Sequence, residues 1–141
     1  MLAWLESSDP FPPVERALKN PNGLLAAGAG LSPERLLDAY RRGVFPWYSG
    51  GEPVLWWSPD PRMVLYCDEL KVARSLAKSL RNKGYELRTD SAFAEVLKGC
   101  AEREEGTWLG SDMQAAYLRL HRAGYAHSFE TWLGHDLVGG L

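Results

Sequence analysis

The sequence predicts an α+β protein of two domains, and three observations favour this class. The chain has 141 residues, 45% hydrophobic and 24% charged, so it is globular and long enough to bury a core. Residues 1–31 contain four prolines and are expected to be mostly loop. Beyond the breaker Ser58-Pro59-Asp60-Pro61, helix and strand patterns alternate regularly. We therefore expect a small N-terminal domain at residues 1–61 and a second domain at 62–141.

In the N-terminal domain, the helix with the clearest boundaries begins after Ser32. A serine N-cap followed by Pro33 at the first helical position is a typical start, and Gly43 is expected to end the helix. The other elements expected here are a helical turn at 14–19 and a short strand at 54–57; a second short strand is expected at 63–66, just after the breaker.

The second domain shows clearer helix and strand signals. Helices are expected at 70–83, stopped by Gly84, at 90–101, capped by Asp90, and at 111–123, capped by Ser111. Strands are expected at 85–89, at 126–133 and from Asp136 onward, the last two joined by a Gly134-His135 turn. A strand that stops as it enters a sheet leaves an open edge, so we expect the sequence to be cut short at Leu141.

Composition and charge exclude several classes of protein. No window approaches the roughly 18 apolar residues of a membrane span, and the N-terminus does not resemble a signal peptide, so we expect a soluble, cytoplasmic protein. The net charge of −2 gives no overall bias toward nucleic acid. Cys67 and Cys100 are expected to be buried thiols, and the three histidines lack metal-ligand spacing. We therefore expect no metal and no cofactor.

A local basic patch lies on the helix expected at 70–83. Arg74, Lys78 and Arg81 recur at steps of three and four residues, and Lys71 and Lys83 flank them without an intervening acid. The apolar residues recur every four positions on a different face, at Val72, Leu76 and Leu80. Because neighbouring like charges repel, the patch suggests an anionic partner such as a phosphate backbone; the alternative is a solvated basic face.

The stretch RRGVFPWYSGGEPVLWWSPDPR, residues 41–62, combines aromatic side chains with frequent turn residues. Its rings could form the core that an irregular segment needs, or they could be stacking platforms for nucleobases. Trp108 lies in a second loop, in REEGTWLG, and one ring on each side of a base would clamp it. Only an unpaired base offers both faces, so a clamp joined to a basic helix predicts binding of a nucleic acid end.

Three other patterns carry little weight. GAGLSP lacks the third glycine of a dinucleotide-binding loop, because Pro33 stands there. Glu102, Glu104 and Glu105 could serve as acid or base, but a run of acids around an arginine is more typical of a solvated loop. No nucleophile motif is present, and no catalytic residue is assigned.

Several long motifs occur together and in a fixed order. They are PNGLLAAGAGLSPERLLDAYRRGVFPWYS, LWWSPDPR, GCAEREEGTWLG, AYLRLHRAGYAHSFETW and LVGG. In these motifs and in their order, the chain from Phe11 onward resembles the bacterial leucyl/phenylalanyl-tRNA–protein transferases. The resemblance implies a small N-terminal domain followed by an acyl-CoA N-acyltransferase-like (GNAT-like) α/β domain, which would be incomplete here. It also implies transfer of leucine or phenylalanine from aminoacyl-tRNA to the N-terminal arginine or lysine of a protein, which marks that protein for degradation.

The resemblance also assigns roles to residues. It implies that Trp47 and Trp108 hold the 3′-terminal adenosine of the aminoacyl-tRNA, with Tyr40 and Phe45 lining the same site. It further implies that the basic helix contacts the tRNA acceptor stem through Arg74, Lys78 and Arg81. The family's proton relay and most of its amino-acid pocket are expected beyond Leu141.

Two other interpretations stay open from the sequence. The first is a module that binds the tRNA 3′ end without transfer activity. The second is an N-acyltransferase with an acyl-CoA donor, which is weaker because the double-tryptophan clamp has no role in it.

Overall fold

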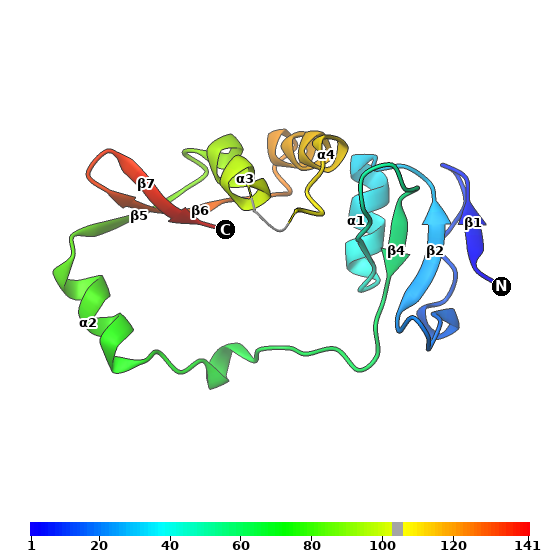
Figure 1. The fold of residues 1–141 in the computed structure, drawn as a ribbon, viewed down its shortest axis with the longest axis horizontal. Coiled ribbons are helices and arrows are strands. Elements are labelled where there is room, and N and C mark those ends of the chain that lie inside the picture. The colour runs from blue at the N-terminus through cyan, green and yellow to red at the C-terminus, as the bar shows by residue number, and fades with distance from the viewer. Residues whose placement is uncertain (103–105) are drawn as a thin grey trace.

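The computed structural model describes residues 1–102 and 106–141. It confirms the α+β class: two β-sheets lie toward opposite ends of an elongated molecule, with helices between them (Figure 1). A long connection leaves the first sheet, carries one helix away from the rest of the chain and returns to the second sheet.

The N-terminal sheet has four strands in the order β1-β2-β4-β3. The strands are β1 (Ala3–Leu5), β2 (Leu24–Gly28), β3 (Phe45–Pro46) and β4 (Leu55–Trp57); β1 and β2 are parallel and the other pairs antiparallel. A 3₁₀ turn, η1 (Val14–Arg16), precedes β2 within the stretch where a helical turn was expected. Trp56 is fully buried at the centre of β4, where its indole nitrogen donates to Gly28 O at 2.8 Å.

Helix α1 (Pro33–Arg41) packs beside this sheet and begins as predicted. Ser32 Oγ accepts a hydrogen bond from Arg35 N at 3.2 Å, and Pro33 occupies the first turn. Gly43, just past the helix, has a φ of +71° that few other residues adopt without strain. Leu36 in α1 and Val44 are fully buried in the same core as Trp56.

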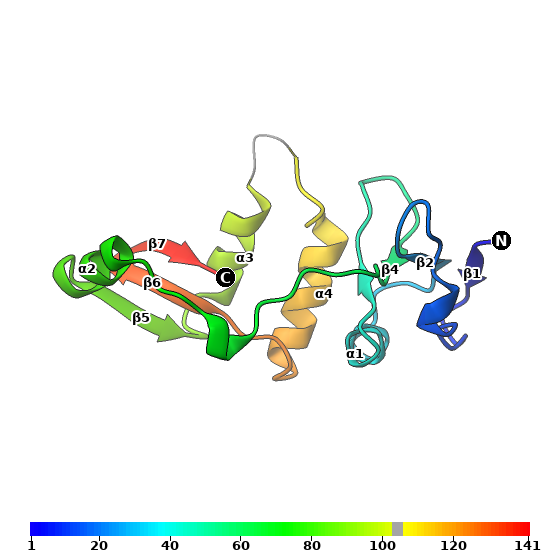
Figure 2. The ribbon, with the colours of Figure 1, turned by 90° about the horizontal axis from the view of Figure 1, so that it is seen from below.

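Helix α4 (Ser111–Arg122) contributes to the same core from much later in the sequence. Its Ala116 and Leu120 pack with the α1 residues, and both views place α4 between α1 and α3 (Figure 2). A second, smaller core gathers under α3 (Phe93–Ala101), where Met113 is fully buried against Leu97 and Leu109. The helix α4 therefore joins the two cores.

The C-terminal sheet is antiparallel, with the order β5-β6-β7. Its strands are β5 (Tyr85–Thr89), β6 (Phe129–Leu133) and β7 (Asp136–Gly140). The predicted strand 85–89 and the hairpin at Gly134-His135 are both confirmed. The strand expected from residue 126 starts three residues later, because residues 126–128 leave the sheet to contact α4 and Asp90.

The connection from β4 to β5 differs most from the prediction. Residues 63–66 form no strand, because no other segment of the described chain pairs with them. A 3₁₀ turn, η2 (Cys67–Glu69), follows, and α2 (Arg74–Asn82) is shorter than the helix expected at 70–83. No residue of α2 is buried. Cys67 is exposed and Cys100 half-buried, so the expectation of a buried thiol is wrong for Cys67.

The predicted caps of α3 and α4 are also wrong. Asp90 lies before α3 with a φ of +56°, and its carboxylate turns toward Ser128 N instead of the helix. Helix α3 has no side-chain cap; Glu130 of β6, a residue distant in sequence, binds the amides of Ser91 and Ala92 just before the helix. Ser111 is the first residue of α4 and Gly110 occupies the N-cap position.

Candidate functional site

The tryptophans predicted to form a clamp line one cavity of about 630 Å³. Trp47 and Trp108 are 61 positions apart in sequence, and each is partly exposed, by 54% and 40%. The remaining lining comes from both loops: Tyr48, Ser49, Glu52, Leu55 and Trp57 on one side, and Gly106 and Thr107 on the other. The fold therefore brings the two predicted rings to one hollow and leaves both accessible to a ligand.

The Trp47 side of the cavity is fixed by the N-terminal sheet. Trp47 N donates to Leu55 O at 2.9 Å, and the Trp57 indole nitrogen donates to Trp47 O at 2.7 Å. The rings of Trp47 and Trp57 are 5.8 Å apart, tilted by 59°. Trp56 points into the core from the same strand. The aromatic loop thus contains both alternatives considered from the sequence, a buried ring and exposed rings.

The Trp108 side is fixed by the first turns of α4. Gln114 Nε2 donates to Leu109 O at 2.8 Å, and Leu109 N donates to Thr107 Oγ1 at 3.0 Å. The ring of Trp108 meets the ring of Tyr117 edge-on, with centroids 6.4 Å apart. Backbone and ring of this loop are therefore anchored to one helix.

Tyr40 and Phe45 lie close to this region but do not line the cavity. The Tyr40 hydroxyl shares a hydrogen bond with the Tyr117 hydroxyl, and burial, followed by the effect of Tyr117, raises the pKa of Tyr40 well above its ordinary value. Phe45 lies in β3, where the guanidinium of Arg62 stacks over its ring at 4.6 Å. Tyr40 is thus linked to Trp108 through Tyr117, whose ring packs against that tryptophan.

A second cavity, of about 280 Å³, adjoins the first and was not predicted from the sequence. Trp108 lines both cavities. The other lining side chains are largely apolar and come from α3, from α4 and the loop before it, from the segment before β6 and from the residue after β7. They include Phe93, Val96, Leu97, Leu109, Tyr117 and Leu141. The apolar positions of α3 were visible in the sequence, but nothing there indicated that they leave a cavity.

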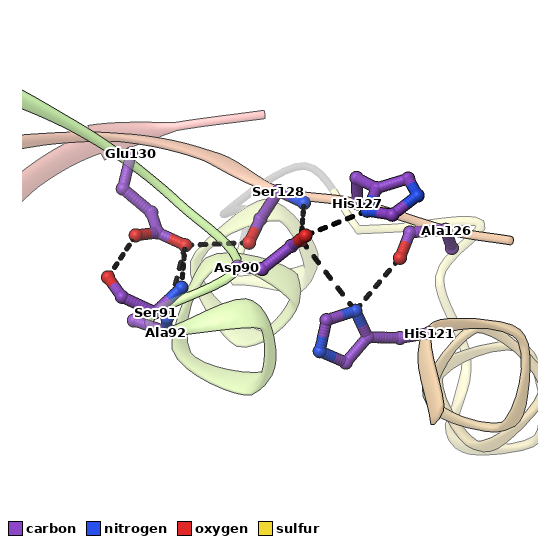
Figure 3. A network of polar contacts seen from close by, with 8 residues as sticks. All are labelled: Asp90, Ser91, Ala92, His121, Ala126, His127, Ser128 and Glu130. Atoms are coloured by element: carbon purple, nitrogen blue, oxygen red, sulfur yellow. Dashed lines mark hydrogen bonds and ion pairs between the residues drawn. The ribbon is translucent and has the colours of Figure 1, made fainter. Parts of the chain in front are cut away.

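A polar network lies where β5 ends and β6 begins (Figure 3). Glu130 is only 1% exposed; it accepts from Ala92 N at 3.0 Å and from Ser128 Oγ at 2.6 Å, and Ser91 Oγ also donates to it. Burial alone would raise the pKa of Glu130, but the hydrogen bonds outweigh burial and lower it to about 2. Its carboxylate therefore stays charged and holds the start of α3 against β6.

Asp90 forms the other half of the network. His127 Nδ1 donates to Asp90 Oδ2 at 2.7 Å, and His121 Nδ1 lies 3.8 Å from Asp90 Oδ1 and 2.8 Å from Ala126 O (Figure 3). The hydrogen bond between the two side chains lowers the pKa of Asp90 and raises that of His127. Because His127 and Ser128 line the second cavity, this network shapes one of its walls.

The predicted tRNA-binding residues Arg74, Lys78 and Arg81 lie on α2, away from the N-terminal sheet (Figure 1). None of the ion pairs found among the described residues involves a cation of α2. The structure thus leaves this basic face unneutralised within residues 1–102 and 106–141 and does not bring it to the cavities.

The remaining candidates have no chemical site around them. Glu102 pairs with Lys98 at 3.6 Å on the surface, whereas Glu104 and Glu105 lie outside the described residues. No group of three or more potential metal ligands occurs in the described part of the chain. Nor does that part contain a helix long and apolar enough to cross a membrane.

Comparison with known proteins assigns this arrangement to a family. The family model described as "Leucyl/phenylalanyl-tRNA protein transferase" matches residues 64–141, and the model of that family's N-terminal domain matches residues 29–60. The chain belongs to the leucyl/phenylalanyl-tRNA protein transferase family. Both cavities and the basic helix are therefore features of a member of this family.

Curated leucyl/phenylalanyl-tRNA–protein transferases are closely similar in sequence. The protein of Chromobacterium violaceum is 61% identical over all of this chain and 62% of its own length. The proteins of Nitrosomonas europaea and Thiobacillus denitrificans are 58% and 63% identical over 100% and 93% of the chain. The chain spans about three fifths of the length of these relatives.

Proposed function

We propose that this chain forms the part of an aminoacyltransferase that binds the aminoacylated 3′ end of tRNA. The whole enzyme would move leucine or phenylalanine from aminoacyl-tRNA to the N-terminal arginine or lysine of a protein and so mark that protein for degradation. The observation that carries the proposal is that Trp47 and Trp108, from distant parts of the chain, line one cavity. The names of the relatives, leucyl/phenylalanyl-tRNA–protein transferases, support the transfer activity.

In this proposal the first cavity takes the terminal adenosine and the second contributes part of the pocket for the amino-acid side chain. An adenine ring between Trp47 and Trp108 would gain about 1–3 kcal/mol of stacking per base. Trp108 lines both cavities, so a base and an aminoacyl group carried on one ribose can reach the two together. The apolar lining of the second cavity suits leucine and phenylalanine. Tyr40 would support the clamp through Tyr117, and Phe45 would support it from β3.

The reaction needs no covalent enzyme intermediate. The α-amine of the acceptor attacks the ester carbonyl of the aminoacyl-tRNA, a C–N bond forms, and the C–O bond to the ribose breaks. The proton lost by the amine balances the one gained by the ribose hydroxyl. Because the ester is already activated, holding the two reactants in line supplies most of the rate enhancement. We assign no catalytic residue within this chain.

The remaining features follow from the same proposal. Arg74, Lys78 and Arg81 would bind phosphates of the acceptor stem, since each cation that neutralises a phosphate releases a counterion. We place the boundary between an N-terminal domain and a GNAT-like acyltransferase domain at residue 61. We further propose a cytoplasmic location and no requirement for a metal or cofactor.

A chimaera tests the proposed activity. Residues 1–141 would replace the corresponding portion of the Chromobacterium violaceum relative, to which they are 61% identical. We expect this chimaera to transfer labelled leucine from leucyl-tRNA to a peptide that begins with arginine, and not to the same peptide beginning with glutamate. An inactive chimaera beside an active parent would contradict the proposed activity. If such a chimaera still bound leucyl-adenosine, the chain would be a module that binds the tRNA end.

A further inference from the structure

A side-chain hydrogen bond that the sequence did not reveal connects the segments on the two sides of the first cavity. The Tyr48 hydroxyl donates to Asp112 Oδ2, across 64 positions of the chain. Tyr48 follows Trp47 directly and lines the same cavity, whereas Asp112 belongs to the first turn of α4, just after the Trp108 loop. The bond therefore joins the two segments that carry the clamp.

The Asp112 end of this bond is held firmly. Asp112 Oδ1 accepts from Met113 N at 2.9 Å, and the Met113 side chain is fully buried in the second core. In the same turn, Gln114 fixes the Trp108 loop by donating to Leu109 O at 2.8 Å. One turn of α4 thus sets the position of Asp112 and, independently, the path of the Trp108 loop.

The Tyr48 end lies in a loop that has two hydrogen bonds of its own. Ser49 N donates to Glu52 Oε2 at 2.9 Å, and Glu52 N donates to Ser49 O at 3.1 Å. These bonds shape the loop but do not tie it to α4. Burial, and then the hydrogen bond to Asp112, raise the pKa of Tyr48, so its hydroxyl keeps the proton that it donates.

We propose that Tyr48 and Asp112 are positioning residues that set the gap between the Trp47 and Trp108 rings before the ligand arrives. This inference rests on the proposed function, because it assumes that the two rings hold the terminal adenine. A base stacked on two faces requires both rings at a defined separation. A gap that is fixed in advance avoids the ordering that a mobile loop would undergo on binding, and this strengthens affinity.

A double-mutant cycle measures this role. Dissociation constants for adenosine and for an amide-linked leucyl-adenosine would be compared in the parent chain, Tyr48→Phe, Asp112→Ala and the double variant. We expect each single variant to bind both probes about two- to ten-fold more weakly, the range expected for loss of one solvent-exposed hydrogen bond. The dissociation constant of the double variant should be no larger than that of the single variant that binds less tightly, because both changes remove the same bond.

Matched controls separate this role from general destabilisation. Tyr125→Phe removes a phenol hydroxyl from an exposed tyrosine outside both cavities, and Asp136→Ala removes an exposed carboxylate in β7. Both should bind like the parent. Asp112→Asn, which keeps an acceptor for the Tyr48 hydroxyl, should recover most of the affinity lost in Asp112→Ala. Melting temperatures would confirm that every variant compared is folded at the assay temperature.

The outcomes distinguish the inference from the proposed function beneath it. If neither the parent chain nor the chimaera binds leucyl-adenosine, or if Trp47→Ala binds as tightly as the parent, the proposed function is wrong and the inference falls with it. If Trp47→Ala weakens binding but Tyr48→Phe does not, the proposed function stands and the inference is wrong. Independent, additive losses in the double variant would also overturn the inference, because the two residues would then not act through one bond.

Discussion

Helix α1, beside the N-terminal sheet, and helix α2 have similar patterns of apolar residues but differ in what covers their apolar faces. In α1, Leu36 is 0% exposed and packs under the sheet, while in α2 the corresponding stripe residue Leu76 is 52% exposed. Both lie in nine-residue helices with an apolar face. The difference shows that the pattern can specify a helix without specifying what its apolar face will contact.

The same contrast separates the two parts of the candidate site. The clamp lies where the N-terminal sheet meets α4, so packed elements hold its rings in place. The basic face of α2 lies on a helix without buried residues, at some distance from that clamp. If the proposed function is right, base recognition depends on packing within this chain, whereas phosphate recognition depends on charge and on exposure.

The largest expected effect is on the free energy of unfolding, when one leucine of α1 and one leucine of α2 are each replaced by alanine. Leu36→Ala removes a fully buried side chain from a helix and should lower the free energy of unfolding by about 2–5 kcal/mol. Leu76→Ala makes the same change on the exposed stripe of α2 and should alter the free energy of unfolding by less than about 0.5 kcal/mol. Urea denaturation measures both. Equal losses would mean that α2 is packed as tightly as α1.

The next largest expected effect is on the salt dependence of tRNA binding, which the charges of α2 should set. Replacing Arg74, Lys78 and Arg81 together by alanine should make the slope of log affinity for tRNA against log salt less negative by about 2–3, since each phosphate contact adds close to 0.9. Filter binding across a salt series measures the slope. The matched control replaces three cations that already have carboxylate partners, Arg42, Arg88 and Lys98. If the control trio changed the slope as much, α2 would have no special role.

The sequence predicted those parts of the fold that depend on local signals. The Ser32-Pro33 helix start, the strand 85–89 and the Gly134-His135 hairpin each depend on neighbouring residues, and all three are confirmed. The cap of α3 is different: Asp90 has the right residue type, but its carboxylate binds Ser128 N, and α3 has no side-chain cap. The prediction of a strand at 63–66 was wrong because an extended segment needs a partner strand to form a sheet.

The candidate site divides in a similar way. Motifs indicated Trp47 and Trp108 because unusual aromatic residues in loops are visible one by one, and the structure places both on one cavity. The Tyr48 and Asp112 pair could not be found from the sequence, because neither residue is unusual alone and 64 positions separate them. The second cavity escaped prediction since it is the space left between helices, which no single stretch encodes.

The smallest expected effect is a pH dependence from the Asp90–His127 pair. The raised pKa of His127 means that its contribution to stability is complete below about pH 6.5 and is lost as pH rises through the folded-state value. The lowered pKa of Asp90 means that its contribution is complete above about pH 4 and is lost as pH falls further. The pair should therefore stabilise most between about pH 4 and 6.5.

Thermal melts across pH measure this dependence. Between pH 6 and 8, the melting temperature of the parent should fall by a few degrees more than that of Asp90→Asn, in which the partner charge is absent. His135→Asn, a change in the exposed hairpin turn, should retain the parent's profile. Identical profiles for the parent and Asp90→Asn would show that the pair does not contribute to stability.

The most direct test of the central claim is whether Trp47 and Trp108 bind one base between them. Titration of the chain with amide-linked leucyl-adenosine would be compared for the parent, Trp47→Ala, Trp108→Ala and Trp4→Ala, the last an exposed tryptophan of β1 outside both cavities. The account predicts that each clamp variant loses about 1–3 kcal/mol of binding free energy while Trp4→Ala binds like the parent. Unchanged binding in both clamp variants would contradict it.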